Sequence, residues 1–299
     1  MSIPVTIVYA VTVWLLCGGM TNNRWWQFIC YAVTTYLVME LNNVNALIRI
    51  FSRMVSCAFL ALTCCACFLF PALPEAVMLV CLVASVLLLF QTYQDKTAAG
   101  FTYYAFLFYS IASIAYVHVL FFLPIIWLLM ITNIMSMSWR TWAASIIGLL
   151  TPYWFGSIWL IYQHEYTLIA DHFSALMVFE EPFNLYGITS YQKATLALTA
   201  LMAVIGIVHF IRKNYLDKIR IRMFYGFFMW MDLAAFVFLW LQPQHFNAML
   251  LIMILNTSPL IAHFIALTST RLTNIVFLLL SAATIVLTFY NIWSSSSLY

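Results

Sequence analysis

Charged residues are scarce in this chain. Of its 299 residues, only 7% are Asp, Glu, Lys or Arg, and the formal net charge is +3. Soluble domains carry roughly 25% charged residues. A soluble fold of this composition would leave a large apolar area in water, because no fold buries all of its side chains. The scarcity therefore excludes a soluble domain, and the small charge without a long basic run argues against nucleic acid as a partner.

Sequence patterns that bind nucleotides or activate a nucleophile are also missing. The chain has no P-loop, no Gly-x-Gly-x-x-Gly pattern, no His-Glu-x-x-His and no Gly-x-Ser-x-Gly. Such patterns supply backbone N–H groups for phosphates, ligands for a metal or an exposed serine. Their absence argues against a nucleotide-driven pump, and no bound cofactor is implied.

Apolar residues dominate instead. Hydrophobic residues make up 66% of the chain and aromatic residues 18%, with a mean hydropathy of +1.00. A membrane-spanning helix needs about 20 mostly apolar residues. The chain is therefore expected to be an all-α, polytopic transmembrane helix bundle in a bacterial inner membrane, forming a single domain over residues 1–299.

Polar clusters divide the apolar sequence into about 10–11 spans. Tyr116, His118 and Pro124 are the only breaks within residues 101–136, so the count stays open between the two numbers. The predicted spans are 3–20, 25–40, 54–73, 75–92, 101–117, 119–136, 141–162, 194–212, 223–241, 247–269 and 275–293.

Lys and Arg predict the orientation, because they are enriched in cytoplasmic loops. The most basic segment, residues 211–222, is placed in the cytoplasm. With eleven spans, ten of the 12 basic residues then lie inside, and only Arg24 and Lys193 lie outside. This predicts a cytoplasmic N-terminus and an external Ser-rich C-terminal tail.

Two segments between spans are expected to lie along the membrane surface. Residues 40–54 interleave apolar and polar side chains, which predicts an interfacial helix or an inner extension of the second span. Residues 163–193 form a long external loop, and long ordered loops are often functional. There we expect one short surface helix, followed by a turn at Pro182 and Gly187.

The external loop supplies the candidate catalytic residues His164, Glu165 and Asp171. His164–Glu165 and Asp171–His172 are seven residues apart, so a continuous helix would place both pairs on one face. Carboxylates and imidazoles close together can bind a divalent metal or act as a general base. Solvated loop charges are the alternative, and no metal site is predicted.

A second set of candidates forms an intramembrane polar layer. Asp232 lies midway along a predicted span, where a charge is costly and must be paired, neutralised or turned inward. By helical depth it could meet His263 in the next span, although a histidine bonded to a backbone carbonyl is the alternative. Two further spans contain a proline at similar depth, which typifies broken helices that line a cavity. The other members of this layer are Asn256, Thr151, Pro152 and Pro259.

The seven cysteines all lie in the first 81 residues. Cys64, Cys65 and Cys67 have a spacing seen in metal sites, but their neighbours are apolar. We therefore expect buried structural cysteines.

Residues 116–155 resemble a family of uncharacterised multi-pass membrane proteins of the Bacteroidota. That family shares an apolar span, a short inner loop with (R/W)xW, and a following LLGLLTPYxF motif. Ile146–Ile147 replaces the two leucines of the pattern. The resemblance transfers no catalytic residue. The matching residues are Arg140, Trp142, Gly148, Leu149, Leu150, Thr151, Pro152, Tyr153 and Phe155.

The chain more distantly resembles integral membrane glycosyltransferases that use polyprenyl-linked sugar donors, and polysaccharide polymerases. Residues 245–260 are similar to a late proline-containing helix of these enzymes. Those glycosyltransferases place an acidic residue in the first external loop, whereas residues 18–24 here contain none. This departure favours a degenerate or accessory role.

Three functions are therefore expected to compete. The first is a glycosyltransferase-like or polymerase-like protein that handles lipid-linked envelope glycans, with a lateral groove near residues 163–193 that Glu165 or Asp171 faces. The second is a scaffold for other envelope proteins, with an exposed small-residue seam such as Ala143–Ser145 with Gly148. The third is a transporter of a small solute or protons, with a polar cavity at Asp232, Asn256 and His263.

Overall fold

A computed structural model of the protein describes residues 3–18, 24–165, 167–184, 186–268 and 270–296. All regular structure in these ranges is helical, with no strand, as the apolar spans predict. Residues 19–23 of the predicted first external loop, and 297–299 of the predicted external tail, lie outside them. Contacts group the chain into two compact units, residues 1–73 with 182–299, and residues 74–181.

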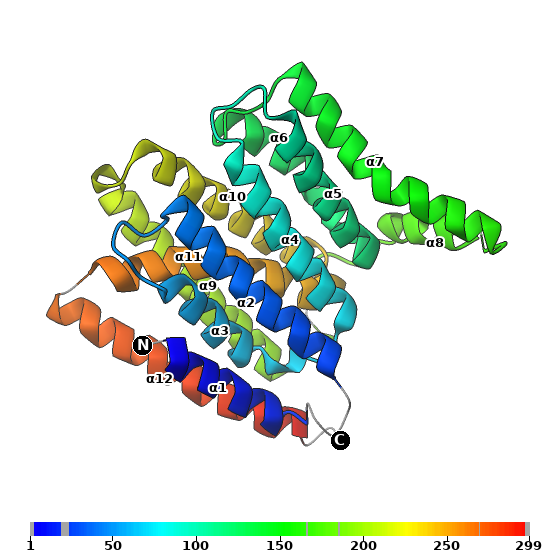
Figure 1. Ribbon diagram of the computed structural model, residues 1–299. Helices are drawn as coiled ribbons and strands as arrows, with labels where there is room; N and C mark the ends of the chain where they lie inside the picture. Colours follow the sequence, from blue (N-terminus) through cyan, green and yellow to red (C-terminus); the bar gives the residue numbers. More distant parts are fainter. Residues whose placement is uncertain (1–2, 19–23, 166, 185, 269, 297–299) are drawn as a thin grey trace. The chain divides into compact units, whose positions relative to one another are not determined.

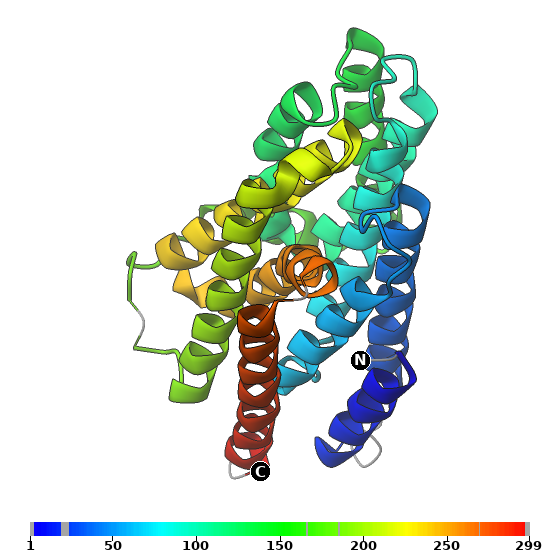
Figure 2. The ribbon, with the colours of Figure 1, turned by 90° about the vertical axis from the view of Figure 1, so that its left-hand side faces the viewer.

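The first unit is a bundle around one central helix, α11. Its helices are α1 (Ile3–Leu16), α2 (Trp25–Asn45), α3 (Met54–Cys65), η1 (Cys67–Leu69), α9 (Ser190–Lys213), η4 (Asn214–Leu216), α10 (Ile219–Leu241), η5 (Pro243–His245), α11 (Phe246–Leu267) and α12 (Arg271–Ser296). α11 packs against α3, α9 and α10, and Figure 2 shows it among other helices of the unit. It is buried along most of its length because its residues are apolar on every face.

Gly206 allows α9 to approach α11 closely. A Cβ atom at this position would lie only 2.7 Å from the backbone carbonyl carbon of Leu260. Small residues at helix contacts replace the hydrophobic driving force that lipid does not provide between spans. The contact therefore depends on a residue without a side chain.

The second unit is built on the parallel pair α5 and α7, because earlier residues of each helix lie together (Tyr103 with Gly148) and so do residues further along (Ser113 with Tyr153). Its helices are α4 (Leu73–Gln91), α5 (Ala99–Ala115), η2 (Val117–Phe122), α6 (Leu123–Thr132), α7 (Trp139–Tyr162), α8 (Thr167–Ser174) and η3 (Ala175–Met177), with Leu73 at its boundary. A capping box of Ser138 and Thr141 starts α7. A Cβ on Gly148 would collide with the carbonyl oxygen of Tyr103, so this pair also relies on a glycine.

Each predicted span overlaps a helix of the structure. Six of the described helical segments are long and apolar enough to cross a membrane, and they centre on α4, α7, α9, α10, α11 and α12. The segments Ile3–Leu16, Met54–Cys65, Ala99–Ala115 and Val117–Thr132 are apolar but shorter. These features show a multi-pass membrane protein. The ten or eleven crossings, their orientation and the inner membrane stay predictions.

The two predicted surface segments have mixed outcomes. α2 extends to Asn45, as an extension of the second span predicts, but Ala46 is left-handed with φ of 48° and no helix covers residues 46–53. In the long loop, α8 is the expected short helix, and residues 178–184 are non-helical around Pro182.

Candidate functional site

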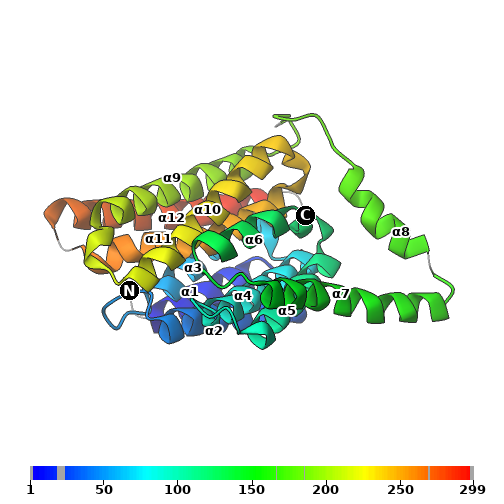
Figure 3. The same cartoon turned by 90° about the horizontal axis from the view of Figure 1, so that it is seen from above.

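A pocket of about 480 Å³ lies in the second unit between α7 and α8. α8 runs back from the end of α7 at an angle, as Figure 3 shows. The wall of the pocket is mixed in character. Its apolar part includes Ile114, Leu160, Leu168 and Ile169, and its polar part includes Tyr153, Ser157, Asp171 and His172.

Two histidines bind the α8 segment, which consists of α8 and η3, to the rest of its unit. His172 on α8 hydrogen bonds with Tyr153 on α7, with 3.3 Å between Nε2 and Oη. His118 on η2 donates its Nε2–H to the backbone carbonyl of Ala175 at 3.2 Å. These two contacts, at His172 and Ala175, therefore hold the C-terminal part of α8 and the start of η3 against the rest of the unit.

The hydrogen bonds of Tyr153 determine the tautomer of His172. Ser113 Oγ donates to the Ser110 carbonyl at 2.7 Å, so the 2.8 Å contact between Ser113 and Tyr153 must use the tyrosine proton. Tyr153 Oη is then left to accept, and His172 donates from Nε2. This leaves the Nδ1 lone pair of His172 able to take up a proton.

The environment of His172 also keeps its ring neutral. Partial burial lowers the pKa of His172 below its ordinary value, because burial disfavours the charged form. A neutral imidazole can act as a general base, and so can a carboxylate such as that of Asp171.

Only one of the three predicted catalytic residues lines this pocket. Asp171 does, while His164 and Glu165 are exposed in the turn before α8. His164 is left-handed, with φ of 61°, and the Glu165 N–H bonds back to the Leu160 carbonyl. This Schellman-type ending stops α7 at Tyr162. The prediction that both pairs share one helix face is therefore wrong, because a helix terminus separates them.

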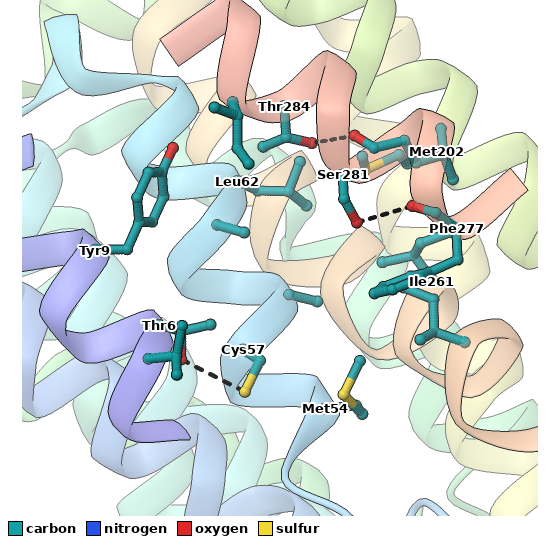
Figure 4. A pocket seen from close by; sticks show the side chains of 16 residues that line it. Thr6, Tyr9, Met54, Cys57, Leu62, Met202, Ile261, Phe277, Ser281 and Thr284 are labelled. Carbon is teal, nitrogen blue, oxygen red and sulfur yellow. Dashed lines mark hydrogen bonds between the residues drawn. The ribbon is translucent and has the colours of Figure 1, made fainter. Parts of the chain in front are cut away.

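The first unit contains a second, almost wholly apolar pocket of about 200 Å³. Figure 4 shows it between α1, α3, α9, α11 and α12. Polar side chains in its wall already have hydrogen-bond partners. Thr6 donates to the Ile3 carbonyl and lies 3.5 Å from Cys57 Sγ, and Ser281 donates to the Phe277 carbonyl. Such a lining suits a hydrocarbon chain and offers nothing to a charged solute.

Asp232 lies in a dry helix contact. Its side chain is buried, and Oδ1 accepts a hydrogen bond from Thr257 on α11 at 3.2 Å. The neighbouring Asn256 and Ser258 bond to carbonyls of their own helix. Asp232 therefore joins α10 to α11, as a carboxyl that bridges two spans does.

The predicted pair of Asp232 with His263 does not form. His263 Nε2 bonds instead to Asp217 Oδ2 at 3.0 Å. The predicted depths of these two residues were wrong because the predicted helix ends differ from those of the structure. α10 starts at Ile219 and α11 ends at Leu267, so Asp232 and His263 lie roughly 20 Å and roughly 6 Å from those ends.

The prolines do not break their helices. α7 continues through Pro152 and α11 through Pro259. Thr151 bonds to the Ile147 carbonyl and belongs with Pro152 to the second unit, whereas Asp232, Asn256, Pro259 and His263 belong to the first. A polar layer that combines all six stays a prediction.

Sequence reasoning missed several residues of these sites. Tyr153 was read only as part of a motif, and Ser113 was not singled out within its apolar span. Asp217 lies in the basic segment 211–222, where an acid looks like a solvated counter-charge. The available signal was that Asp217 is the only acid in that segment.

Cys64, Cys65 and Cys67 are buried and free, as expected for structural cysteines. Within the described residues, no three His, Cys, Asp or Glu side chains gather closely enough to hold a metal ion.

Comparison with known proteins leaves the family open. No family model, no curated protein and no solved structure matches the chain.

Proposed function

We propose that this membrane protein handles lipid-linked envelope glycans and that the pocket between α7 and α8 receives the polar head group. The observation that carries the proposal is the mixed wall of the pocket, with Asp171, His172 and Tyr153 beside Leu160, Leu168 and Ile169. An amphiphile with a hydroxyl-rich head and a hydrocarbon tail matches such a wall. A soluble sugar would leave the apolar part without a partner.

The polar residues have the chemistry that sugar transfer needs. In such a transfer, an acceptor hydroxyl oxygen bonds to the anomeric carbon, the bond from that carbon to the lipid phosphate breaks, and the hydroxyl proton goes to a base. Asp171 or Nδ1 of His172 is the candidate base. Asp171 on α8 would take the role of the acidic residue that the polyprenyl-donor glycosyltransferases have in their first external loop, because residues 18–24 here contain no acid.

The apolar pocket of the first unit supports a lipid-linked ligand separately. It is lined by Met54, Ala61, Leu62, Met202 and Ile261 among others. A lining of this kind accepts a hydrocarbon chain, and the lipid bilayer is the partner that supplies one.

The test is the glycan profile of a deletion strain. Lipid-linked oligosaccharides and surface glycans are compared by mass spectrometry with those of the parent strain. We expect a truncated glycan or an accumulated lipid-linked intermediate. An unchanged profile would overturn the proposal.

Expression of single-residue variants in the deletion strain then tests whether the pocket between α7 and α8 is the active site. We expect Asp171→Asn to restore the profile at most weakly, and Tyr153→Phe to reduce restoration by about tenfold or more, as losing general-base support does. Glu165→Gln is the matched control, because this acid lies six residues away outside the pocket lining. Full restoration by Asp171→Asn and also by His172→Gln would remove both candidate bases and leave only a non-catalytic, accessory role on the same pathway.

A further inference from the structure

A buried cluster of titratable side chains lies in the first unit, and none of its members is in the lining of either pocket described above. Asp217 follows η4, and its side chain is only 1% exposed, as is that of His263 on α11. The two are joined at 3.0 Å. Arg49, from the segment between α2 and α3, places Nε 4.0 Å from Asp217 Oδ1 and donates to the Leu216 carbonyl.

Three polar atoms around His263 have no hydrogen-bond partner. They are Nδ1 of His263 itself, Nε2 of His209 on α9 and the hydroxyl of Tyr225 on α10. The His263 ring centroid lies 5.5 Å from that of His209 and 4.9 Å from that of Tyr225. Buried polar atoms are rarely left unpaired, and each one in a native protein requires an explanation.

The tautomer of His263 follows from Asp217. A carboxylate only accepts, so Nε2 of His263 carries the hydrogen and Nδ1 keeps a free lone pair. All three partnerless atoms are shielded from solvent. Whatever engages them must therefore be small, and a proton on an imidazole is the smallest such ligand.

The charges around the cluster favour a single proton. Asp217 attracts a positive charge on either imidazole, whereas Arg49 and Lys213 repel it. Two charged imidazoles at this separation would also repel each other. Tyr225 faces the same ring and adds a neutral hydroxyl.

We propose that His263, His209 and Asp217 form a buried proton-binding site in which two imidazoles share one proton. The site contains residues of α9 and α11 and the residue that follows η4, and Arg49 connects it to the segment between α2 and α3. It is independent of the glycan proposal, since it shares no residue with the pocket between α7 and α8.

The test is side-chain NMR of ¹⁵N-histidine-labelled full-length protein in lipid nanodiscs, titrated from pH 4 to pH 9. The chain has only six histidines, so each ring can be assigned by substitution. We expect the signals of His209 and His263 to follow one another, each sensing both protonation steps, because strongly interacting sites titrate as a pair. This titration is made on the wild-type protein, so its result does not depend on whether a variant folds.

Substitutions then test whether His209 and His263 titrate as a coupled pair or only have similar midpoints. His209→Asn should move the midpoint of His263 by about one pH unit, and Asp217→Asn should replace the single Nε2–H tautomer of His263 by a mixture. His245→Asn, elsewhere in the unit, is the control that should change neither. Independent single-step titrations, or two rings that keep the same protonation throughout, would overturn the proposal.

Discussion

Asp232 and Asp217 show that burial alone does not identify a functional acid. Both are buried acids of the first unit. Asp232 meets a single hydroxyl, which satisfies it. Asp217 meets a histidine and an arginine, and its histidine faces two more groups without partners. The residues around each carboxyl, rather than its depth, separate a helix bridge from a proton site.

Substitution of Asp232 tests the bridging role. We expect Asp232→Asn to keep the wild-type glycan profile and thermal midpoint, because an amide oxygen also accepts from Thr257. Asp232→Ala loses that bond, which is worth about 0.6–1.7 kcal/mol between membrane helices, and should lower the midpoint in a thermal unfolding assay. Lost function in a stable Asp232→Asn protein would contradict this and favour the transporter hypothesis.

His172 gives the α8 segment a pH dependence. Its pKa is lower in the folded protein than the ordinary value of about 6.5, because burial disfavours the charged ring. Protonation therefore favours the undocked segment, and the attachment of α8 weakens as the pH falls through the ordinary histidine range. Limited proteolysis of residues 163–184 should be faster at pH 5 than at pH 7.5.

His164→Asn is the control for this effect, since His164 is exposed in the neighbouring turn. His172→Gln should remove most of the pH dependence. A cleavage rate that is the same at both pH values in the wild-type protein would show that His172 does not control the segment.

At the scale of elements, glycines decide which helices touch. In the small-residue seam Ala143–Ser145 with Gly148, Gly148 meets Tyr103 on α5, and the buried Ser145 accepts a hydrogen bond from Trp127 on α6. The scaffold hypothesis named an exposed seam of small residues, and in this seam Ala144, Ser145 and Gly148 are buried within the chain itself. α9 uses Gly206 against α11 in the same manner.

Gly206→Val should separate α9 from α11. The added side chain meets the backbone of Leu260 rather than a flexible side chain, and overpacking of this kind costs about 1–3 kcal/mol. We expect a lower thermal midpoint. Gly156→Ala is the matched control, since nothing lies within 4 Å of a Cβ there. An unchanged midpoint for Gly206→Val would mean that α9 can shift freely.

Helix identity was readable from the sequence, but helix ends were less so. Runs of apolar residues located every long helix, because lipid demands both apolar side chains and internal hydrogen bonding. The end of α7 at Tyr162 agrees with the predicted span 141–162, although a left-handed histidine rather than a glycine stops the helix there. The start of α10 escaped prediction because basic residues of its first turn looked like a loop.

At the scale of the molecule, composition indicates a multi-pass membrane protein, and the six long apolar helices agree with it. Other apolar helices are shorter than a membrane crossing requires. α1 spans about 21 Å at 1.5 Å per residue, less than the roughly 30 Å hydrocarbon core. Orientation therefore rests on the distribution of Lys and Arg.

Single-cysteine labelling tests that orientation. In intact spheroplasts, a membrane-impermeant maleimide should label Glu181→Cys in the predicted external loop, but should reach Lys218→Cys only after the membrane is opened. Both positions are exposed, so access is limited only by the membrane. The native cysteines, none of which is exposed, provide the background control. The opposite pattern would invert the topology.

The sequence by itself determined that the chain is helical, lies in lipid and forms its long helices where apolar runs occur, because these properties depend on local composition and backbone hydrogen bonding. Only the tertiary structure decided which polar side chains meet. Asp171 joins His172 and Tyr153 at one pocket because α7 ends at a left-handed histidine and α8 turns back. His263 meets Asp217 instead of Asp232 because pairing depends on helix ends and packing, which are fixed by contacts between residues far apart in the chain.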